Sequence, residues 1–563
     1  MLQERAAEPV VVVGAGPVGL SAAIELARRD VPVRIVDAAT GPSTTSKAIG
    51  THARTLEALA HSGVTDRLVE RGLPIRRFRL HDRTRVLGDL DLDEVPSAFP
   101  YALSLGQDVT ERVLLDRLSE LGAEVEWGRR LEALQQDLDS PGSAEVRLVL
   151  ARDGAGDDHD GAAGASEEMA ASWVVGCDGA RSTVRRQAGI GFTGEPFSEW
   201  FLVADLLIDG DLGEQRANLF FSDTGATAVF PLPEPGAFRL ATPLPRPEAA
   251  EDAPTIDIAA IEHLWNGRVG RPARLSEPRW ISPFQFQIRL ADQYRRGRVF
   301  LAGDAAHVHS PVGGQGMNTG IQDVVNLAWK LAAVRRGAPE ALLDTYQTER
   351  RPVAAHVLAQ TRRNAVVVSS GSAAVRTARA VILPLVTRAA PVRRRILNEL
   401  TMLSVSYPPH VLPGSPPGPS LSERITGAAA VGERAPDAQI VRAGEPGRLL
   451  DVLAPRAHTL LCFDAGHSAD VHLPTGLDLD VRDDITVALV RRCHPSRATG
   501  ADPERRLEVD DPAGQAHRTY AVSRPLAVLV RPDGVIGWRG TLASAGSSGL
   551  RAVLDTQLPA EVT

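Results

Sequence analysis

Cysteine is scarce in this chain of 563 residues, which contains three cysteines in all. Cys177, Cys462 and Cys493 lie far apart in the sequence, and their number is odd. Neither a disulfide framework nor a cysteine-rich zinc site fits this distribution. Such low cysteine usage is typical of proteins in a reducing compartment, so we expect a cytoplasmic protein.

A positive charge excess is also absent. Lys and Arg together number 62 and Asp and Glu 70, which gives a formal net charge of -8, and aromatic residues make up 4% of the chain. Proteins that hold nucleic acid need a basic surface to neutralise its phosphates. We therefore expect no nucleic-acid partner.

Long apolar runs are missing as well. No uninterrupted apolar span reaches the length of a membrane helix, so we expect no membrane partner. The N-terminal stretch MLQERAAEPVVVVGAG carries acidic residues and lacks the basic region and cleavage site of a secretion signal. The length itself exceeds what one small core can serve and indicates two to four domains.

The first informative stretch is a glycine-rich motif near the N-terminus. A β-branched run, Val10 to Val13, precedes Gly14, Gly16 and Gly19; a helical stretch and a second strand follow, and that strand ends at Asp37. This order of strand, G-x-G-x-x-G, helix, strand and acid is the dinucleotide-binding pattern. Gly14 would make the tight turn, Gly16 would let the backbone approach a pyrophosphate, Gly19 would allow close packing, and Asp37 would accept from ribose hydroxyls. The pattern does not distinguish FAD from NAD.

A second apolar strand ends in an Asp-Gly turn at Asp178, after a stretch from Ala151 to Ser172 whose small and acidic residues indicate a surface loop. Arginines 181, 185 and 186 follow the turn and form either a solvated face or a binding site for phosphate. Lys47 is equally open between a phosphate contact and a surface lysine. Thr51 is a plausible cap for the helix that follows it.

The third stretch runs from Arg298 to Lys330. An apolar run at Val299 to Ala302 predicts a buried strand that turns at Gly303-Asp304; Gly313, Gly314 and Gly316 and then a helical pattern follow. A strand, a glycine-rich loop and a helix N-terminus in this order make an anion-binding site. His307 and His309 in this stretch suggest a metal site, but no third ligand is evident, so we expect no metal.

VVVGAGPVGL, GCDGARSTVR and FLAGDAAHVHSPVGGQGMNTGIQDVVNLAWKL occur in this order. In combination they resemble the class A flavoprotein monooxygenases, the family of para-hydroxybenzoate hydroxylase, over roughly residues 9 to 400. The segments TSKAIGTHARTLEAL and YRRGRVFLAGDAAH are similar in sequence to those of aromatic polyketide hydroxylases.

The resemblance implies FAD as cofactor and NAD(P)H as co-substrate. It implies that the Gly14 loop and Asp37 hold the adenosine half of FAD, and that Asp178 serves both FAD and NAD(P)H. Gln107 and Asp304 would contact the diphosphate and ribityl region, and the loop from Pro311 to Asn318 would line the isoalloxazine. The implied cofactor-binding set is Gly14, Gly16, Gly19, Asp37, Lys47, Gln107, Asp178, Asp304, Pro311, Gly316, Met317 and Asn318. Lys47 departs from the family, whose members commonly have Arg there, so a bidentate phosphate contact is lost.

The pattern between Phe197 and Phe286 changes to short strands, which predicts a mainly antiparallel sheet. Phe220, Phe221 and Phe230, with Phe284 and Phe286, are candidates for a substrate pocket wall, although strand periodicity makes each more typical of core than of a ligand contact. No base for a phenol is identified by the sequence, and His52, Arg54 and Tyr407 are the candidates.

The predicted fold is α/β: a Rossmann-like FAD-binding domain, an interleaved antiparallel-sheet substrate domain and a thioredoxin-like C-terminal domain. We expect the FAD-binding domain at residues 1–190 and 286–406, the substrate-binding sheet at 191–285, a proline-rich linker at 407–430, and the C-terminal domain at 431–563. Cys462 has no C-x-x-C partner, so the last domain is expected to be structural.

The predicted function is an FAD-dependent, NAD(P)H-consuming monooxygenase that hydroxylates an aromatic polyketide-like substrate with molecular oxygen, through a flavin C4a-hydroperoxide. Two alternatives stay open: Baeyer–Villiger-type oxygen insertion into a polyketide ketone on the same scaffold, and a non-catalytic flavin-binding protein. The sequence leaves the exact substrate, the choice between NADH and NADPH, and the oligomeric state open.

Overall fold

The computed structural model describes residues 8–138, 145–152, 166–196, 199–244, 254–285, 287–309, 313–369, 373–408, 428–454, 456–464, 484–492, 506–542 and 548–559. Most of the predicted linker, residues 409–427, lies outside the described residues, as do Cys493, Pro311 and Phe286. Within the described parts of the chain, no helix is long and apolar enough to cross a membrane.

The centre of the molecule is a six-stranded sheet that is parallel except at one edge. It contains, in spatial order, β20 (Arg295–Arg296), β21 (Val299–Leu301), β12 (Trp173–Gly176), β1 (Val10–Val13), β2 (Val33–Asp37) and β8 (Val125–Trp127). The central strands β1, β12 and β21 are apolar and buried throughout, as expected for parallel strands that are covered on both faces. The register pairs Val13 with Gly176 and Gly176 with Leu301, so the three strands that carry the sequence motifs are neighbours.

Three helices pack together beside this sheet: α1 (Pro17–Ala27), α4 (Gln107–Glu120) and α7 (Gln315–Arg335). A three-stranded sheet of β9 (Arg129–Gln135), β10 (Val146–Arg152) and β11 (Ser166–Ala171) joins the same hydrophobic core, and α5 (Thr183–Gln187) lies against β9. The loop expected from Ala151 to Ser172 is therefore wrong at its end. Residues 166–171 form a strand because they pair antiparallel with β10.

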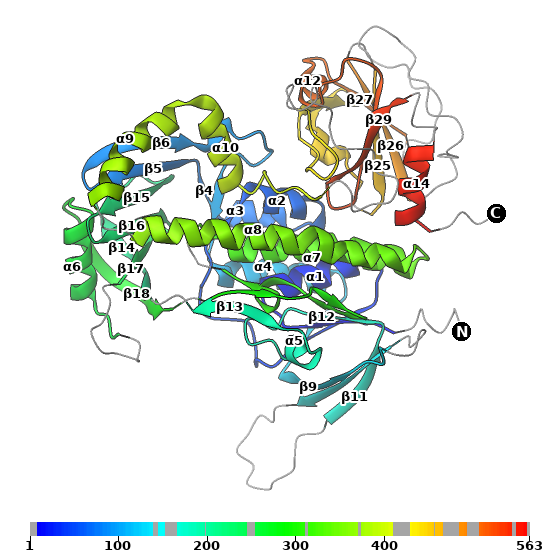
Figure 1. Cartoon of the computed structure of the whole chain (residues 1–563), viewed down its shortest axis with the longest axis horizontal. Coiled ribbons are helices and arrows are strands. Elements are labelled where there is room, and N and C mark those ends of the chain that lie inside the picture. Colours follow the sequence, from blue (N-terminus) through cyan, green and yellow to red (C-terminus); the bar gives the residue numbers. More distant parts are fainter. Residues whose placement is uncertain are drawn as a thin grey trace.

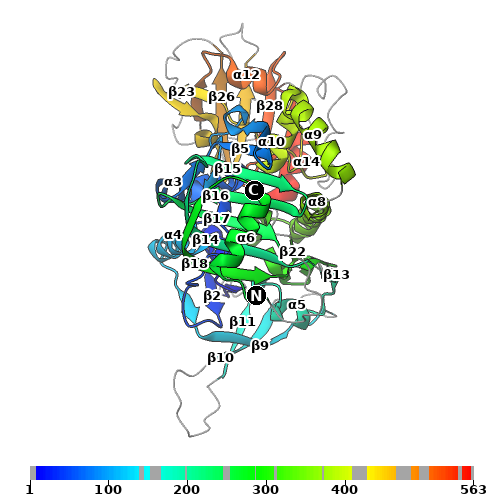
Figure 2. The same ribbon diagram turned by 90° about the vertical axis from the view of Figure 1, so that its left-hand side faces the viewer.

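A seven-stranded sheet forms the second domain (Figures 1 and 2). Its order is β18 (Arg274–Phe284), β14 (Phe201–Asp209), β17 (Ala237–Pro243), β16 (Gly225–Pro231), β15 (Arg216–Ser222), β5 (Arg77–Asp82) and β6 (Arg85–Asp91), with α6 (Ile258–Arg268) packed on one face. The middle segment is mainly antiparallel, as predicted. However, β5 and β6 also belong to this sheet, although the sequence assigned their residues to the FAD-binding part. They join it because β5 pairs in parallel with β15.

Long helices connect these domains, and α8 (Asp344–Ser369) crosses the middle of the molecule in Figure 1. Thr51 does not cap α2 (Ala53–Leu59): Thr51 belongs to β3, and the N-cap residue is His52, whose side chain makes no capping hydrogen bond. The remaining elements before the C-terminal domain are β3 (Gly50–Thr51), η2 (Ala60–Ser62), α3 (Thr65–Arg71), β4 (Leu73–Ile75), η3 (Leu92–Glu94), β7 (Ala102–Ser104), β13 (Phe192–Pro196), β19 (Gln287–Ala291), η4 (Gly303–Ala305), β22 (His307–Val308), η5 (Glu340–Leu343), α9 (Ala373–Arg388) and α10 (Ala390–Leu400).

The C-terminal domain is built on a mixed seven-stranded sheet above the ends of α7 and α8 (Figure 1). Cys462 in β25 is buried, and desolvation raises the pKa of its thiol to about 12, which supports a structural role. The thioredoxin-like assignment stays a prediction. The elements are β24 (Glu445–Arg448), β23 (Gln439–Arg442), η6 (Leu449–Val452), β27 (Arg506–Asp510), β26 (Ile485–Arg491), β25 (His458–Phe463), α12 (Gln515–Thr519), β28 (Leu526–Val530), β29 (Ile536–Thr541) and α14 (Ser548–Gln557).

A buried polar network joins this domain to α7 and α8. Arg531 donates to both carboxylate oxygens of Glu349 in α8 at 2.6 and 2.9 Å and also pairs with Asp533. Lys330 in α7 donates to Glu349 at 2.9 Å, and Asn326 donates to Glu349 at 2.6 Å and to Asp533 at 3.1 Å. Each charged group of this network is therefore paired and hydrogen-bonded, which offsets the cost of burying it.

His517 gives the C-terminal domain a pH-dependent contribution to stability. Its two ring nitrogens lie 2.8 Å from carboxylate oxygens of Asp511 and Asp464. Burial by itself would lower the pKa of His517, but the bonds to the two carboxylates outweigh it and raise that pKa. A raised folded pKa means that the stabilisation is complete below the ordinary value of about 6.5 and is lost as the pH rises through the folded pKa.

We therefore expect the free energy of unfolding of this domain to fall as the pH rises above about 6.5. His517→Gln should remove this dependence and destabilise the domain by roughly 1.5–3 kcal/mol below that pH. Hydrogen exchange across residues 458–541 at several pH values measures it, with the exposed His263→Gln as control. Equal pH dependence in wild type and His517→Gln would contradict the assignment.

Candidate functional site

The three sequence motifs meet at one edge of the parallel sheet. Gly14, Cys177 and Ala302 each follow the carboxyl end of a strand, and β1, β12 and β21 are adjacent. Neighbouring parallel strands end at the same edge, and this edge is where ligands bind in open α/β sheets. The Gly14 loop, the Asp178 turn and the Asp304 turn are thus brought together although they are far apart in sequence.

The three glycines of the first motif meet different surroundings. Gly14 has a positive φ of +104°, and a Cβ there would overlap the carbonyl of Cys177. A Cβ on Gly19 would overlap the carbonyl of Gly14, whereas a Cβ on Gly16 would meet nothing within 4 Å. Gly14 and Gly19 are therefore required by backbone packing, and Gly16 leaves room for a ligand.

Asp37 stabilises this loop. Its carboxylate accepts hydrogen bonds from the backbone N–H of Ala15 at 2.6 Å and of Ala39 at 2.8 Å. Asp37 does not line the cavity described below. The predicted contact with a ribose would therefore use lone pairs left over from these two bonds.

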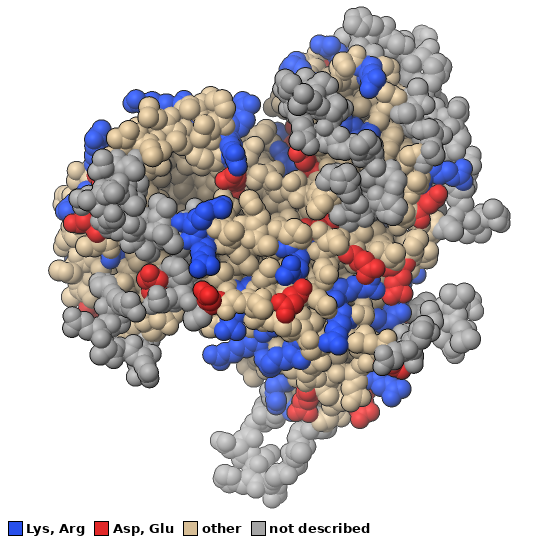
Figure 3. Space-filling model, viewed as in Figure 1, with Lys and Arg blue, Asp and Glu red and all other residues tan. Residues whose placement is uncertain are grey.

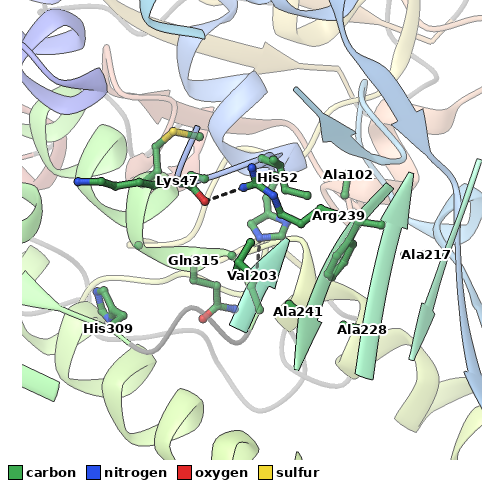
Figure 4. Close-up of a pocket in the computed structure, with 18 of the residues that line it drawn as sticks. Lys47, His52, Ala102, Val203, Ala217, Ala228, Arg239, Ala241, His309 and Gln315 are labelled. Carbon is green, nitrogen blue, oxygen red and sulfur yellow. Dashed lines mark hydrogen bonds between the residues drawn. The ribbon is translucent and has the colours of Figure 1, made fainter. Parts of the chain in front are cut away.

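The strand turns open into a cavity of about 890 Å³ that extends to the seven-stranded sheet. Six residues of the predicted cofactor-binding set line it: Gly16, Lys47, Gln107, Asp304, Gly316 and Met317. In Figure 4, Lys47, Gln315 and His309 lie on one side of this cavity, and Val203, Ala217, Ala228 and Ala241 lie on the strands at the other side.

Asp304 belongs to the turn η4 directly after β21 and is exposed to the cavity. Desolvation by the surrounding walls raises the pKa of Asp304, and the positive charges of His307 and Lys47 counter part of that rise. A carboxylate that faces a hollow in this way is placed to accept hydrogen bonds from ligand hydroxyl groups.

Asn318 fixes the loop at the start of α7. Its side-chain amide donates to the carbonyls of Gly50 and Gly314 at 2.8 Å each, and its oxygen accepts from the N–H of His52 at 2.8 Å. Gly313 and Gly314 both have positive φ values, +98° and +63°, which side-chain-bearing residues rarely adopt. Asn318 therefore acts by positioning this loop, and Met317 beside it reaches the cavity.

Asp178 caps α5. One oxygen of its carboxylate accepts from the N–H of Thr183 at 2.6 Å and of Val184 at 3.1 Å, whereas the other is buried without a partner. Arg185 is also structural, because it donates to the carbonyls of Ala305 and Ala180. The sequence left two roles open for these arginines, a solvent-exposed face and a phosphate site. Arg185 has neither role, because it is buried and its guanidinium is bound to these two carbonyls.

His52 is the one candidate base that lines the cavity. Its Nε2 lies 3.0 Å from the carbonyl oxygen of Gly313, and its Nδ1 is buried without a partner. Burial lowers the pKa of His52, so the ring is neutral at pH 7. Arg54 instead donates to the carbonyl of Asp533, and Tyr407 accepts from Arg350, so both face the C-terminal domain and lie outside the cavity lining.

The sheet side of the cavity is set by the alternation of side chains along strands. Phe221 and Phe230 line the cavity, and Phe284 does so as well. Phe220 does not: it points to the opposite face, where it stacks on His81 at 4.3 Å and lies against Trp265. Side chains of successive strand residues point to opposite faces, so the rings of Phe220 and Phe221 lie on opposite sides of the sheet.

Sequence reasoning missed Arg239 and the alanines of this wall. Arg239 pairs with Asp205 on the neighbouring strand and donates to the carbonyls of Ser46 and Lys47 at 2.8 and 2.7 Å (Figure 4). It ties the loop that carries Lys47 to the sheet. The alanines that line the wall come from three adjacent strands: Ala217 from β15, Ala226 and Ala228 at alternate positions of β16, and Ala241 from β17. The sequence signal that could have indicated this wall is the pair of small residues at alternate positions of β16, Ala226 and Ala228.

The residues present fit a dinucleotide cofactor. The cavity end next to the strand turns has an unfilled space at Gly16, an exposed carboxylate at Asp304 and a cation at Lys47. Three polar atoms of cavity-lining residues are buried without a hydrogen-bond partner: Nδ1 of His52, Nδ1 of His309 and Oε1 of Gln315. Such atoms are expected where a polar ligand provides the missing hydrogen bonds. Across the described residues, no group of three or more His, Cys, Asp or Glu is arranged to hold a metal ion. Fold and cavity together define a dinucleotide-dependent enzyme whose cavity also has an apolar wall on the side of the seven-stranded sheet.

Comparisons with known proteins agree with this class. The model of the FAD binding domain matches residues 7–361, and that of the aromatic-ring hydroxylase C-terminal domain matches residues 428–560. The 6-methylpretetramide 4-monooxygenase of Streptomyces rimosus is 42% identical over 69% of this chain and 68% of that protein. The 12-dehydrotetracycline 5-monooxygenase/anhydrotetracycline 6-monooxygenase of S. rimosus subsp. rimosus is 33% identical over 97% of this chain and 98% of that protein.

Solved structures give the same result. An anhydrotetracycline hydroxylase from S. rimosus has a TM-score of 0.73 at 30% identity and covers 98% of this chain and 100% of its own. A ternary complex of aklavinone-11 hydroxylase with FAD and aklavinone has a TM-score of 0.73 at 27% identity, with coverages of 98% and 99%. The chain belongs to the family of FAD-dependent aromatic-ring hydroxylases, the class A flavoprotein monooxygenases. The predicted family and the predicted cofactor, FAD, are confirmed.

Asp304→Ala should fold but retain little FAD. Losing a hydrogen bond to a charged group costs about 1.5–3 kcal/mol, which weakens FAD binding roughly 10- to 150-fold. The ratio of flavin to protein absorbance after purification measures this, with Asp223→Ala on an exposed turn as the matched control. Full FAD retention by Asp304→Ala would show that this carboxylate does not hold the cofactor.

Proposed function

We propose that this enzyme uses FAD and NAD(P)H to hydroxylate an aromatic polyketide with molecular oxygen. The observation that carries the proposal is the two-ended cavity, with the strand turns at one end and a wall of small apolar residues at the other. The names of the relatives support it, because the similar proteins include monooxygenases of tetracycline precursors and a hydroxylase bound to aklavinone. The cytoplasmic location stays a prediction.

The alanine-lined wall favours a flat, fused-ring substrate. Ala217, Ala228 and Ala241 face the cavity from adjacent strands and have no side chain beyond Cβ. A pleated surface of methyl groups is broad and even, so a planar ring system can lie against it with continuous contact. Phe221 and Phe230 border this wall and exclude water.

The protein's own residues bind and orient. Asp304, Lys47 and the Gly16 turn would hold FAD, whose bound form would supply the redox chemistry: two electrons from NAD(P)H and the transfer of one oxygen atom of O₂. Arg239 holds the Lys47 loop against the substrate wall. The Asp178 turn follows the carboxyl end of β12, beside the two other turns, and we place the contact with NAD(P)H there. The apolar wall keeps water away from the reacting ring.

The reaction is tested with the FAD-loaded protein, a fused-ring polyketide phenol, oxygen and NADH or NADPH. We expect substrate-dependent oxidation of the nicotinamide and a product heavier by one oxygen atom, located on a ring carbon. Insertion of the oxygen next to a ketone would instead show Baeyer–Villiger chemistry. Absence of substrate-dependent oxidation with every ring system offered would contradict the proposal.

Ala228→Leu separates the substrate wall from the cofactor end. The larger side chain fills part of the flat wall, so KM for the fused-ring substrate should rise roughly tenfold or more while FAD content stays unchanged, because overpacking costs about 1–3 kcal/mol. Ala259→Leu on the exposed face of α6 is the control.

A further inference from the structure

A chain of hydrogen bonds runs from the cavity wall into the core. His309 lines the cavity, and its Nε2 lies 2.6 Å from Nδ1 of His307. Nε2 of His307 lies 2.6 Å from the carboxylate of Asp323 in α7. His307 and Asp323 are both 0% exposed, and His309 is 8% exposed. The two histidines that suggested a metal site in the sequence therefore bond to each other.

The hydrogen-bond pattern allows two proton arrangements. Burial would raise the pKa of Asp323, but the charges and hydrogen bonds of His307 and Arg350 outweigh it and hold that pKa below its usual range. Asp323 is therefore an acceptor, and His307 must carry a proton on Nε2. Between the histidines, either His309 Nε2–H donates to a neutral His307, or His307 is a cation whose Nδ1–H donates to His309.

These two arrangements set the state of the outermost atom. In the first, Nδ1 of His309 carries a free lone pair; in the second, a neutral His309 carries its proton on Nδ1. Nδ1 is buried and has no hydrogen-bond partner within the described chain. Desolvation, and next the charge of His307, lower the pKa of His309 well below 6.5, so His309 itself is neutral in both arrangements.

We infer that His309, His307 and Asp323 form a proton relay that delivers a proton to the cofactor end of the cavity. This inference rests on the proposed function, which consumes one proton per turnover because the second oxygen atom of O₂ leaves as water. The Nδ1–H bond of His309 breaks as its proton leaves toward the cavity, whose lining includes this ring. The proton on Nδ1 of His307 moves to Nε2 of His309, which leaves His307 neutral and His309 neutral. Solvent recharges the pair after the turnover.

Neighbouring ionisable groups support this arrangement. Arg350 in α8 donates to the other oxygen of Asp323 at 2.8 Å and stays charged. Tyr294 stacks on His307 at 6.1 Å between ring centres, and desolvation raises its pKa well above 10, so it stays neutral. Asp304 on η4 and Lys47 on the cavity loop are the charged groups of the cavity side. None of these four groups is hydrogen-bonded between His307 and the cavity, where His309 lies.

His309→Gln tests the relay by function. The glutamine amide can donate a hydrogen bond to His307 in place of Nε2–H but cannot pass a proton on. Measured at full FAD occupancy, we expect an unchanged substrate KM, a turnover lowered by roughly 10²-fold, and a turnover that rises toward low pH, where solvent supplies the proton. His458→Gln, which replaces a buried histidine of the C-terminal domain, should match the wild type. Wild-type turnover and pH profile in His309→Gln would overturn the relay.

Nuclear magnetic resonance of the FAD-bound wild type, labelled with ¹⁵N-histidine, tests the relay without turnover and without a variant. We expect Nδ1 of His309 to change from protonated to unprotonated as the pH rises, because the loss of one proton from the hydrogen-bonded pair leaves the remaining shared proton on Nε2 of His309. A His309 tautomer that is constant across the titration would overturn the relay. If the wild type hydroxylates no ring system, the proposed function fails, whereas this titration still decides whether the chain moves a proton.

Discussion

The buried carboxylate of Asp323 is the interaction on which the arrangement of the site depends. It accepts from the N–H of Gly303 at 3.2 Å, from His307 and from Arg350. These donors come from the turn that carries Asp304, from β22 and from α8, while Asp323 itself belongs to α7. Removing one partner of such a buried pair typically costs 3–5 kcal/mol. One side chain thus fixes the cofactor turn relative to the helix whose start lines the cavity.

The same helix links the site to the C-terminal domain. The N-terminal residues of α7 line the cavity, and Asn326 and Lys330 farther along it join Glu349, Arg531 and Asp533. The C-terminal domain also contacts α2, where Arg54 donates to the carbonyl of Asp533 and Arg434 pairs with Glu57. Helices α2 and α7, which begin beside the cavity, therefore both contact this domain.

On the face seen in Figure 3, Lys and Arg side chains are interspersed with Asp and Glu.

The parts of the structure that follow from local sequence were predictable. Strand, turn and helix succeed one another within about thirty residues in each motif, so β1, β12, β21 and the glycine turns could be read from spacing and apolar periodicity. Partners that are distant in sequence could not be read in this way. Arg54 and Tyr407 have side chains suited to acid–base chemistry, but contacts with residues of the C-terminal domain and of α8 hold them outside the cavity. Phe220 differs from Phe221 only in strand parity, and β5 joins the substrate sheet through a pairing with β15, which is distant in sequence.

The central claim is that one cavity holds FAD at the strand turns and the aromatic substrate against the alanine-lined wall. A crystal structure of the protein with FAD and a fused-ring phenol tests this most directly. The account predicts FAD in contact with Gly16, Asp304 and Met317 and the ring system against Ala228 and Ala241. A flavin bound elsewhere, or a ring system bound outside the cavity, would contradict it.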